Sequence, residues 1–213
     1  MVLLLLHFML TLKNITNECF RLTSFEATMG STCKIIIQSA YEQKILLNTL
    51  LGLQKPVRGE VFVFNKNIYA IPEKELIKIF RKVSIVWGDG GAISNLSVWE
   101  NITLPACYHT RKKPEAFEGR IIDIYKQMGG DPSYLLKNKG KFFSQLPVHE
   151  KKLLGIIRAM IMEPELILYD SLFEGLSSES LYRIAKLLTK FHREKSDRIS
   201  IHVTSNEHSL ETI

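Results

Sequence analysis

Cysteine and long apolar runs are both scarce in this sequence of 213 residues. The three cysteines, Cys19, Cys33 and Cys107, are too widely spaced to predict a metal-binding pair or a disulfide framework, and a reducing, cytosolic setting fits them best. The opening stretch MVLLLLHFML is shorter than the roughly 20 residues that span a bilayer, and it lacks the basic n-region of a signal peptide. We interpret it as an upstream extension of a first strand, with a small membrane or partner contact as the alternative.

Internal repeats, low-complexity tracts and blocks of like charge are also absent. The net charge is +6, but the lysines and arginines are scattered, which is typical of a solvated surface. We therefore expect no nucleic-acid partner. With 46% hydrophobic and 23% charged residues, the composition is that of a globular protein, and we expect a single domain over residues 1–213.

Strands and helices are predicted to alternate along most of the chain. Apolar periodicity predicts strands over residues 10–16, 25–29, 33–38, 59–69, 83–88, 165–170 and 198–204, and helices over residues 42–53, 73–82 and 178–192. The β-branched run CKIIIQ, which begins at Cys33, is expected to be a central strand. This alternation predicts an α/β domain with a largely parallel sheet. Residues 93–160 instead contain helical segments broken by proline and glycine, which predict an inserted helical subdomain.

A strand, a lysine-bearing loop, a helix and a distant strand ending in aspartate follow one another in the order of a P-loop NTPase. The stretches LLNTLLGLQKPVRGEVFVFNKNI, LSVWENITLP, GIIRAMIMEPELILYD and GLSSES together resemble ATP-binding subunits of ABC transporters, of the short bacterial type. The resemblance extends over residues 10 to about 206. It implies a P-loop NTPase-like ABC ATPase fold, with an antiparallel β subdomain and the inserted helical subdomain beside the core sheet.

The phosphate loop of that family, G-x-x-x-x-G-K-[ST], corresponds to QSAYEQKI in this chain. Lys44 matches the lysine that reaches the phosphates, but Gln38 and Gln43 replace the glycines, and Ile45 replaces the residue whose hydroxyl holds magnesium. Glycine-type backbone angles at other residues cost about 1–3 kcal/mol each, and Glu42 adds a negative charge. Lys44 is either an ordinary lysine at a helix start or a remnant of phosphate binding.

The next site positions depart from the family as well. Gly88 stands where the family has a glutamine that senses magnesium and the attacking water, and the resemblance places Gly88, Asp89, Gly90 and Gly91 beside the groove that receives the permease. Asp89 is either part of a turn or a substitute polar ligand. In the signature L-S-G-G-Q/E this chain reads LPVHE, so the serine and both glycines that clamp a phosphate are missing. His149 is either a surface histidine at a helix start or, when protonated, a partner for a phosphate.

The strand LILYD ends in Asp170, the family's magnesium-holding aspartate, but Ser171 stands at the position of the catalytic glutamate. Loss of a general base typically lowers a rate about 10²–10⁴-fold, and serine cannot act as one near neutral pH. Asp170 is then either a structural residue or a residual cofactor ligand. Ser205 takes the place of the histidine that contacts the γ-phosphate, and strand alternation predicts that His202 points to the opposite face.

These losses fall on both halves of the family's composite ATP site. The resemblance and the losses together predict a pseudo-ATPase: a catalytically inactive subunit that is a structural or docking partner of an integral membrane permease, with lipid transport or a related envelope process as one setting. We expect it to lie peripherally on the cytoplasmic face of the inner membrane, as a homodimer or a heterodimer with another ABC subunit, without a cofactor. The alternatives are weak residual binding of ATP and magnesium, and a divergent but active ATPase that uses Lys44 and Asp170.

Overall fold

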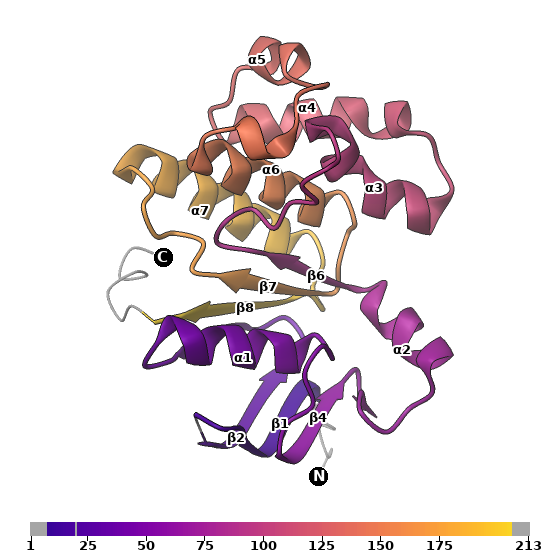
Figure 1. Ribbon diagram of the computed structural model, residues 1–213, viewed down its shortest axis with the longest axis vertical. Coiled ribbons are helices and arrows are strands. Elements are labelled where there is room, and N and C mark those ends of the chain that lie inside the picture. Colours follow the sequence, from indigo (N-terminus) through magenta and orange to yellow (C-terminus); the bar gives the residue numbers. More distant parts are fainter. Residues whose placement is uncertain (1–7, 20, 206–213) are drawn as a thin grey trace.

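Two four-stranded sheets form the framework of the structure. The computed structural model of the chain describes residues 8–19 and 21–205, so most of the apolar opening stretch, residues 1–7, lies outside the described residues. One sheet has the strand order β2-β1-β4-β5 and the other has the order β3-β8-β7-β6. Figure 1 shows the two sheets with helix α1 between them and the remaining long helices beyond the second sheet.

The first sheet is antiparallel, as the resemblance implies. Its strands are β1 (Phe8–Thr16), β2 (Arg21–Thr28), β4 (Arg58–Val63) and β5 (Lys66–Asn67). Strand β1 pairs with both β2 and β4 in antiparallel register. Alternate residues of β1 and β4 are almost fully buried, among them Leu10, Leu12 and Val61, so one face of this sheet covers a core while the other faces solvent.

The second sheet is parallel throughout, and this confirms the predicted core. Its strands are β3 (Thr32–Ile36), β6 (Val83–Val86), β7 (Leu166–Asp170) and β8 (Ile199–Thr204). The helices that connect or flank them are α1 (Ala40–Leu50), α2 (Glu73–Phe80) and α7 (Ser178–Arg193). Along β7, Leu166 and Leu168 join a core shared with the first sheet, while Ile167 and Tyr169 join a core shared with the helices.

The expectation that CKIIIQ forms a central strand is wrong for the described part of the chain. Strand β3 pairs there with β8 alone and lies at the edge of the sheet. Ile36 is 48% exposed, whereas Ile35 beside it is 7% exposed. A short β-branched run fits a half-exposed strand as well as a buried one, so periodicity could not separate the two possibilities.

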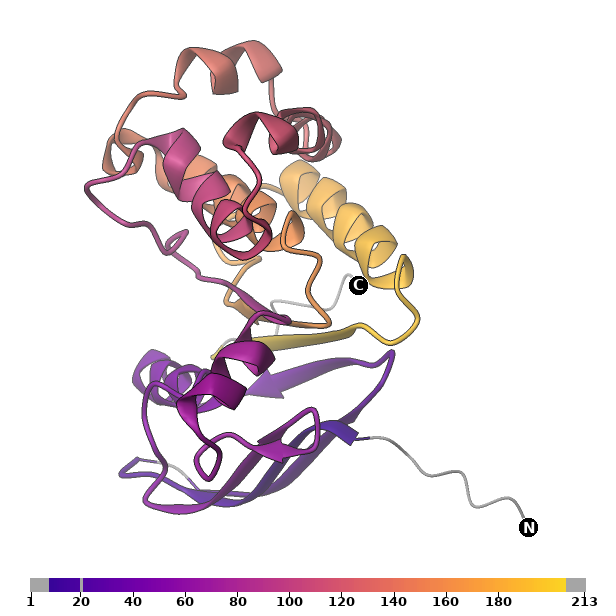
Figure 2. The same ribbon diagram turned by 90° about the vertical axis from the view of Figure 1, so that its right-hand side faces the viewer.

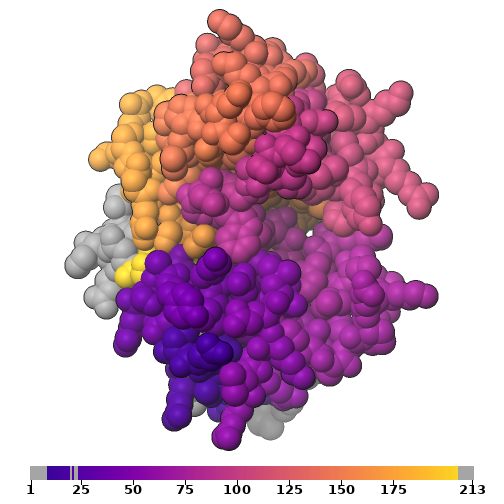
Figure 3. All heavy atoms as spheres, viewed as in Figure 1, coloured from indigo at the N-terminus to yellow at the C-terminus, as the bar shows by residue number. Residues whose placement is uncertain are grey.

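Residues 93–160 are largely helical, as predicted, although their status as a separate subdomain stays a prediction. They contain α3 (Val98–Thr110), α4 (Glu118–Gln127), α5 (Pro132–Lys137) and α6 (Val148–Met160), with short 3₁₀ turns at Pro114–Phe117 and Phe143–Gln145. Helix α3 begins at a capping box between Ser97 and Glu100. These helices lie on the far side of the parallel sheet from the antiparallel sheet (Figure 2), and the two halves of the molecule meet across the middle of the face in Figure 3. Within the described ranges, no helix is long and apolar enough to cross a membrane.

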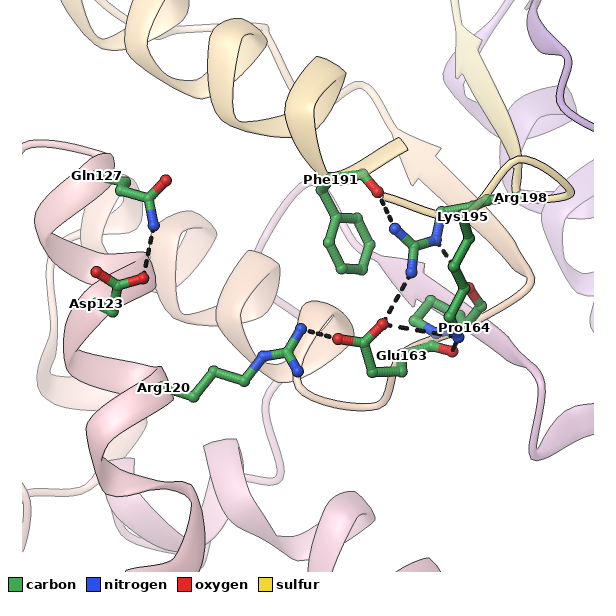
Figure 4. Close-up of polar contacts among 8 residues, drawn as sticks. All are labelled: Arg120, Asp123, Gln127, Glu163, Pro164, Phe191, Lys195 and Arg198. Carbon is green, nitrogen blue, oxygen red and sulfur yellow. Dashed lines mark hydrogen bonds and ion pairs between the residues drawn. The ribbon is translucent and has the colours of Figure 1, made fainter. Parts of the chain in front are cut away.

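A buried arginine connects the end of α7, the loop before β7 and the start of β8 (Figure 4). Arg198 is 0% exposed, and its guanidinium donates to the carbonyls of Pro164 and Phe191 and to the Glu163 carboxylate. Glu163 also pairs with Arg120 of α4 and with Lys195. This carboxylate therefore links a helix of the helical segment to the parallel sheet.

Candidate functional site

The loop between β3 and α1 leads into a capped helix start, and a carboxylate of the chain itself accepts one of the loop's N–H groups. Ser39 caps α1, and its side chain accepts a hydrogen bond of 3.2 Å from the backbone N–H of Glu42. The Glu42 carboxylate in turn accepts one of 3.2 Å from the backbone N–H of Gln38. An anion of the chain itself thus uses an N–H group at the place where the family binds phosphate. The expected backbone strain is absent, because neither Gln38 nor Gln43 has a positive φ.

The side chain of Gln43 is buried against the carboxyl ends of β7 and β8. It is 4% exposed, and its amide nitrogen donates to Asp170 Oδ1 and lies 2.9 Å from Ser171 Oγ and 3.3 Å from the Val203 carbonyl. The amide therefore joins α1 to the carboxyl ends of β7 and β8. The sequence indicated Gln43 as an obstacle to phosphate binding, but this hydrogen bond was not predicted. The available signal was an amide side chain at a glycine position in a chain that keeps the aspartate at the end of β7.

Both carboxylate oxygens of Asp170 are held by the protein. Oδ1 accepts from Gln43, and Oδ2 accepts from the backbone N–H of Gly88 at 3.1 Å. The following residue, Ser171, has a left-handed backbone with φ of 43°, and its N–H donates to the Val203 carbonyl at 3.0 Å. The Asp170 carboxylate thus links β7 to α1 and to the loop after β6.

A cleft of about 550 Å³ lies at the carboxyl ends of β7 and β8. It brings together most of the predicted site positions. Its lining consists of Ala40, Gln43, Lys44, Trp87, Asp89, Gly91, Asp170, Ser171, Glu174 and Ser205. Gly88 borders it through its bond to Asp170, while Gly90 is buried against α6, where a Cβ would lie 2.6 Å from the Lys151 carbonyl.

Two histidines that the sequence analysis considered lie away from this cleft. His149 is outside its lining, and its side chain is 63% exposed beside Glu150. His202 lines a different pocket, stacked between the rings of Tyr169 and Phe173 at centroid distances of 4.5 and 5.6 Å. Burial, with smaller contributions from His192 and Lys34, lowers the pKa of His202 to about 4. His202 and Ser205 therefore face opposite sides, as strand alternation predicts.

The residues of this cleft do not fit magnesium and a nucleotide. Ile45, at the position of the magnesium-binding hydroxyl, is 5% exposed and packs in the core, while the Gln43 amide already holds Asp170. The lining has three carboxylates and one lysine, a balance that disfavours a polyphosphate. Among the residues that the structure describes, no group of three or more His, Cys, Asp or Glu side chains could hold a metal ion.

The loop after β6 separates the cleft from a second, more apolar pocket. The guanidinium of Arg158 on α6 donates to the carbonyls of Gly90 and Gly91, each at 2.7 Å, and the N–H of Gly91 donates to Asp89 at 2.8 Å. Burial lowers the pKa of Arg158, and the nearby Asp89 charge opposes that shift. Neither Arg158 nor Trp87 stood out in the sequence, and Trp87 lines both hollows together with Gly91.

The second pocket has a volume of about 300 Å³ and lies between β6, α3 and α6. Apolar side chains make up most of its lining, including Phe80, Ile85 and Met162. Two further lining residues, Ile93 and Leu104, are 47% and 44% exposed, so the pocket opens onto an apolar surface.

No protein-family model matches the chain. Its curated relatives include the methionine import ATP-binding protein MetN 1 of Bacillus cereus, 27% identical over 86% of this chain and 51% of that protein. Another is the probable ribonucleotide transport ATP-binding protein mkl of Mycobacterium leprae, 25% identical over 86% of this chain and 51% of that protein. The chain thus spans about half the length of the curated relatives that it matches.

Solved structures with a similar fold cover most of the chain. The dimeric ATP-binding cassette MJ0796, bound to ADP and phosphate, matches with a TM-score of 0.77 and 25% identity over 94% of this chain and 90% of that one. CbiO1 from Clostridium perfringens, part of the transporter complex CbiONQ, has a TM-score of 0.71 and 20% identity over 94% of this chain and 79% of that one.

Proposed function

The chain has the fold of ABC ATPase cassettes and resembles ABC transporter ATP-binding subunits in sequence, and we propose that it is a catalytically inactive subunit that serves as a docking partner of a membrane permease. The observation that carries the proposal is the bond from Gln43 to Asp170. Through this hydrogen bond the buried Gln43 amide occupies one carboxylate oxygen of Asp170, the residue at the position where the family holds magnesium.

Three further features support the loss of hydrolysis. Ser171 lines the cleft where the family has its general base, and its hydroxyl lies 2.9 Å from the Gln43 amide nitrogen. Ser205 occupies the position of the γ-phosphate histidine. The Glu42 carboxylate accepts the Gln38 N–H, which would have to be released before a phosphate could bind it. We therefore propose that the subunit works without ATP as a cofactor.

The apolar pocket and the loop from Gly88 to Gly91 support the docking role. Arg158 fixes the carbonyls of Gly90 and Gly91, so the loop keeps its shape without help from a nucleotide. The exposed Leu104 and Ile93 offer apolar surface for a partner helix. The proposed partner is an integral membrane permease, which would hold the chain peripherally at the cytoplasmic face of the inner membrane, as a homodimer or paired with another ABC subunit.

A second candidate is a divergent but active ATPase that energises transport. Its support is that Lys44 and Asp170 line the same cleft and that the curated relatives carry names of ATP-binding proteins. This candidate requires the Gln43 amide to leave Asp170, and the Glu42 carboxylate to leave the Gln38 N–H, before magnesium and phosphates can enter.

Titration with fluorescent ATP and magnesium, beside a turnover assay, separates the two candidates. We expect neither micromolar binding nor hydrolysis, with MJ0796 assayed in parallel as a positive control. Lys44→Ala is the informative variant: it should leave the assembly of the complex and its function unchanged if the subunit is inactive. Micromolar binding with turnover that Lys44→Ala abolishes would overturn the proposal in favour of the active enzyme.

A further inference from the structure

The pocket that His202 lines is separate from the cleft and from the apolar pocket. It lies between α7 and the parallel sheet and has a volume of about 420 Å³, which is the size of a small-molecule site. Its lining consists of Thr32, Tyr169, Phe173, Ala185, Leu188, Thr189, His192, Arg193, Ser200 and His202. We call this hollow the α7 pocket, and it shares none of these described residues with the other two.

The two histidines of the α7 pocket differ in their hydrogen bonds. Both ring nitrogens of His192 are engaged, one with Ser200 Oγ at 3.0 Å and the other with the Gly30 carbonyl at 3.1 Å. His202 is 9% exposed, and its ring nitrogens have no hydrogen-bond partner among the residues that the structure describes. Neither of these nitrogens is sealed from solvent, because the fully buried polar atoms without a partner there belong to other residues. His202 therefore has an N–H donor and an acceptor nitrogen left for a ligand.

Apolar and aromatic side chains make up much of the remaining lining. The rings of Tyr169 and Phe173 lie within 16° and 18° of parallel to the His202 ring. On α7, the half-buried Ala185 and the nearly buried Leu188 add aliphatic surface. A pocket with such surface and a few polar groups suits a ligand that has an apolar body and one polar end, and aromatic walls favour an aromatic body.

The charged groups at the α7 pocket are positive. Arg193 is exposed at the end of α7, and its guanidinium has no hydrogen bond or ion pair within residues 8–19 and 21–205. Burial, and after it the positive charges of His192 and Lys34, lower the pKa of His202, so its ring is neutral near pH 7. The described lining contains no carboxylate. A guanidinium and an N–H donor without an acidic neighbour are complementary to a carboxylate.

We propose that the α7 pocket binds a small aromatic carboxylate. Its negative charge would meet the Arg193 guanidinium, one of its oxygens would accept the His202 N–H, and its ring would lie against Ala185 and Leu188. This site does not depend on the proposed function, because it lies apart from the cleft and from the surface assigned to the permease. It would give the chain a small-molecule ligand whether or not the cleft binds ATP.

The probe is 2-naphthoate, whose own fluorescence anisotropy rises when it binds to the full chain. We expect saturable binding at a single site with a Kd of about 1 mM or lower, which is typical of so small a ligand. Competition with 2-naphthalenemethanol, which has the ring without the charge, should show about tenfold weaker binding. The amine 2-naphthylmethylamine, which has the opposite charge, should not compete. Absence of saturable 2-naphthoate binding, or equal binding of the alcohol or the amine, contradicts the proposed site.

Two variants locate the site on the chain. Arg193→Gln removes the guanidinium, and His202→Phe removes the ring nitrogens but keeps an aromatic ring beside Tyr169. Each should weaken the binding of 2-naphthoate about tenfold, the size of one charge-assisted hydrogen bond. Arg183→Gln is the matched control, because Arg183 is an exposed arginine of the same helix outside the α7 pocket, and it should leave binding unchanged.

Thermal melting of each variant checks its folding. Arg193 is exposed, so Arg193→Gln decides the outcome even if His202→Phe proves unstable. Unchanged binding in Arg193→Gln, or a loss in Arg183→Gln as large as that in Arg193→Gln, would mean non-specific attraction of an anion to a basic surface and would overturn the proposed site. None of these results bears on the loss of ATP hydrolysis, which the turnover assay tests by itself.

Discussion

At the scale of single residues, one buried amide decides how the cleft is built. The amide nitrogen of Gln43 joins the first turns of α1 to Asp170 and Ser171. The residue is almost fully buried, at 4% exposed. The sequence shows glutamine at a position where the phosphate loop of the family has glycine. It could not predict the bond, because the partner lies 127 residues away and its placement depends on the assembled sheet.

Gln43→Ala should therefore destabilise the fold. Alanine keeps the helix propensity of α1 but removes the only side-chain donor to Asp170 Oδ1 that the described structure shows, so we expect the free energy of unfolding to fall by about 1–3 kcal/mol. Urea denaturation measures the change. Gln127→Ala is the matched control, because Gln127 is exposed at the end of α4 and should lose less than about 0.5 kcal/mol. Equal effects at the two positions would show that the bond contributes nothing.

A buried histidine should make stability depend on pH. Burial lowers the pKa of His202 to about 4 in the folded state from the ordinary value of 6.5. Between these two values the unfolded chain binds the proton more tightly, so stability is lost as the pH falls from about 6.5 to about 4, by roughly 2–3 kcal/mol. His202→Phe keeps the aromatic stack with Tyr169 and should flatten the curve of unfolding free energy in that window.

The control for this pH dependence is His149→Gln, because the His149 side chain is 63% exposed. We expect it to reproduce the wild-type curve between pH 4 and 6.5, measured by thermal melting in matched buffers. A wild-type slope that persists in His202→Phe would assign the effect to other groups.

At the scale of elements, most strands and helices could be predicted from apolar periodicity and from glycine and proline positions. The helix predicted over residues 42–53 is α1, and the strand predicted over residues 165–170 is β7, within a few residues at each end. The edge position of β3 could not be predicted, because edge and central strands share the same short apolar pattern. The ion pairs of Glu163 with Arg120, Lys195 and Arg198, the Glu163 cluster, could not be predicted either, because no local sequence pattern indicates contacts between distant residues.

Glu163→Gln tests how much that cluster stabilises the packing of the elements. The Glu163 carboxylate is the only acidic partner, among the ion pairs that the structure describes, of the fully buried Arg198, and it also pairs with Arg120 of α4. Glutamine keeps one acceptor but leaves the guanidinium without its counter-charge, so we expect a loss of about 1–3 kcal/mol in urea denaturation.

The matched control is Glu179→Gln, which breaks an ion pair with Arg183 on the exposed side of α7. Exposed pairs contribute little, so its effect should lie within the error of the measurement. A loss in Glu179→Gln as large as that in Glu163→Gln would mean that burial of Arg198 is not the cause.

At the scale of the whole molecule, the fold and the missing chemistry support different parts of the proposal. The two sheets and the helical segment reproduce the architecture of ABC cassettes, with a TM-score of 0.77 to MJ0796. In the cleft at the carboxyl ends of β7 and β8, the Gln43 side chain donates to Asp170, and beside it the Glu42 carboxylate accepts the Gln38 N–H. The retained fold supports the docking part of the proposal, and the hydrogen bonds of Gln43 and Glu42 support the part that concerns catalysis.

Leu104→Asp tests the surface that we assign to the permease. Leu104 is 44% exposed and lines the apolar pocket beside the loop from Gly88 to Gly91. The aspartate of the variant would place a charge against an apolar partner helix. We expect co-purification with the permease from detergent-solubilised membranes to fall at least tenfold, with an unchanged melting temperature. Leu136→Asp is matched in residue type and exposure, at 39% on α5, and should keep the complex intact. The two variants introduce the same charge at different places. If Leu136→Asp abolishes co-purification while Leu104→Asp does not, the partner therefore binds at α5 rather than at the apolar pocket.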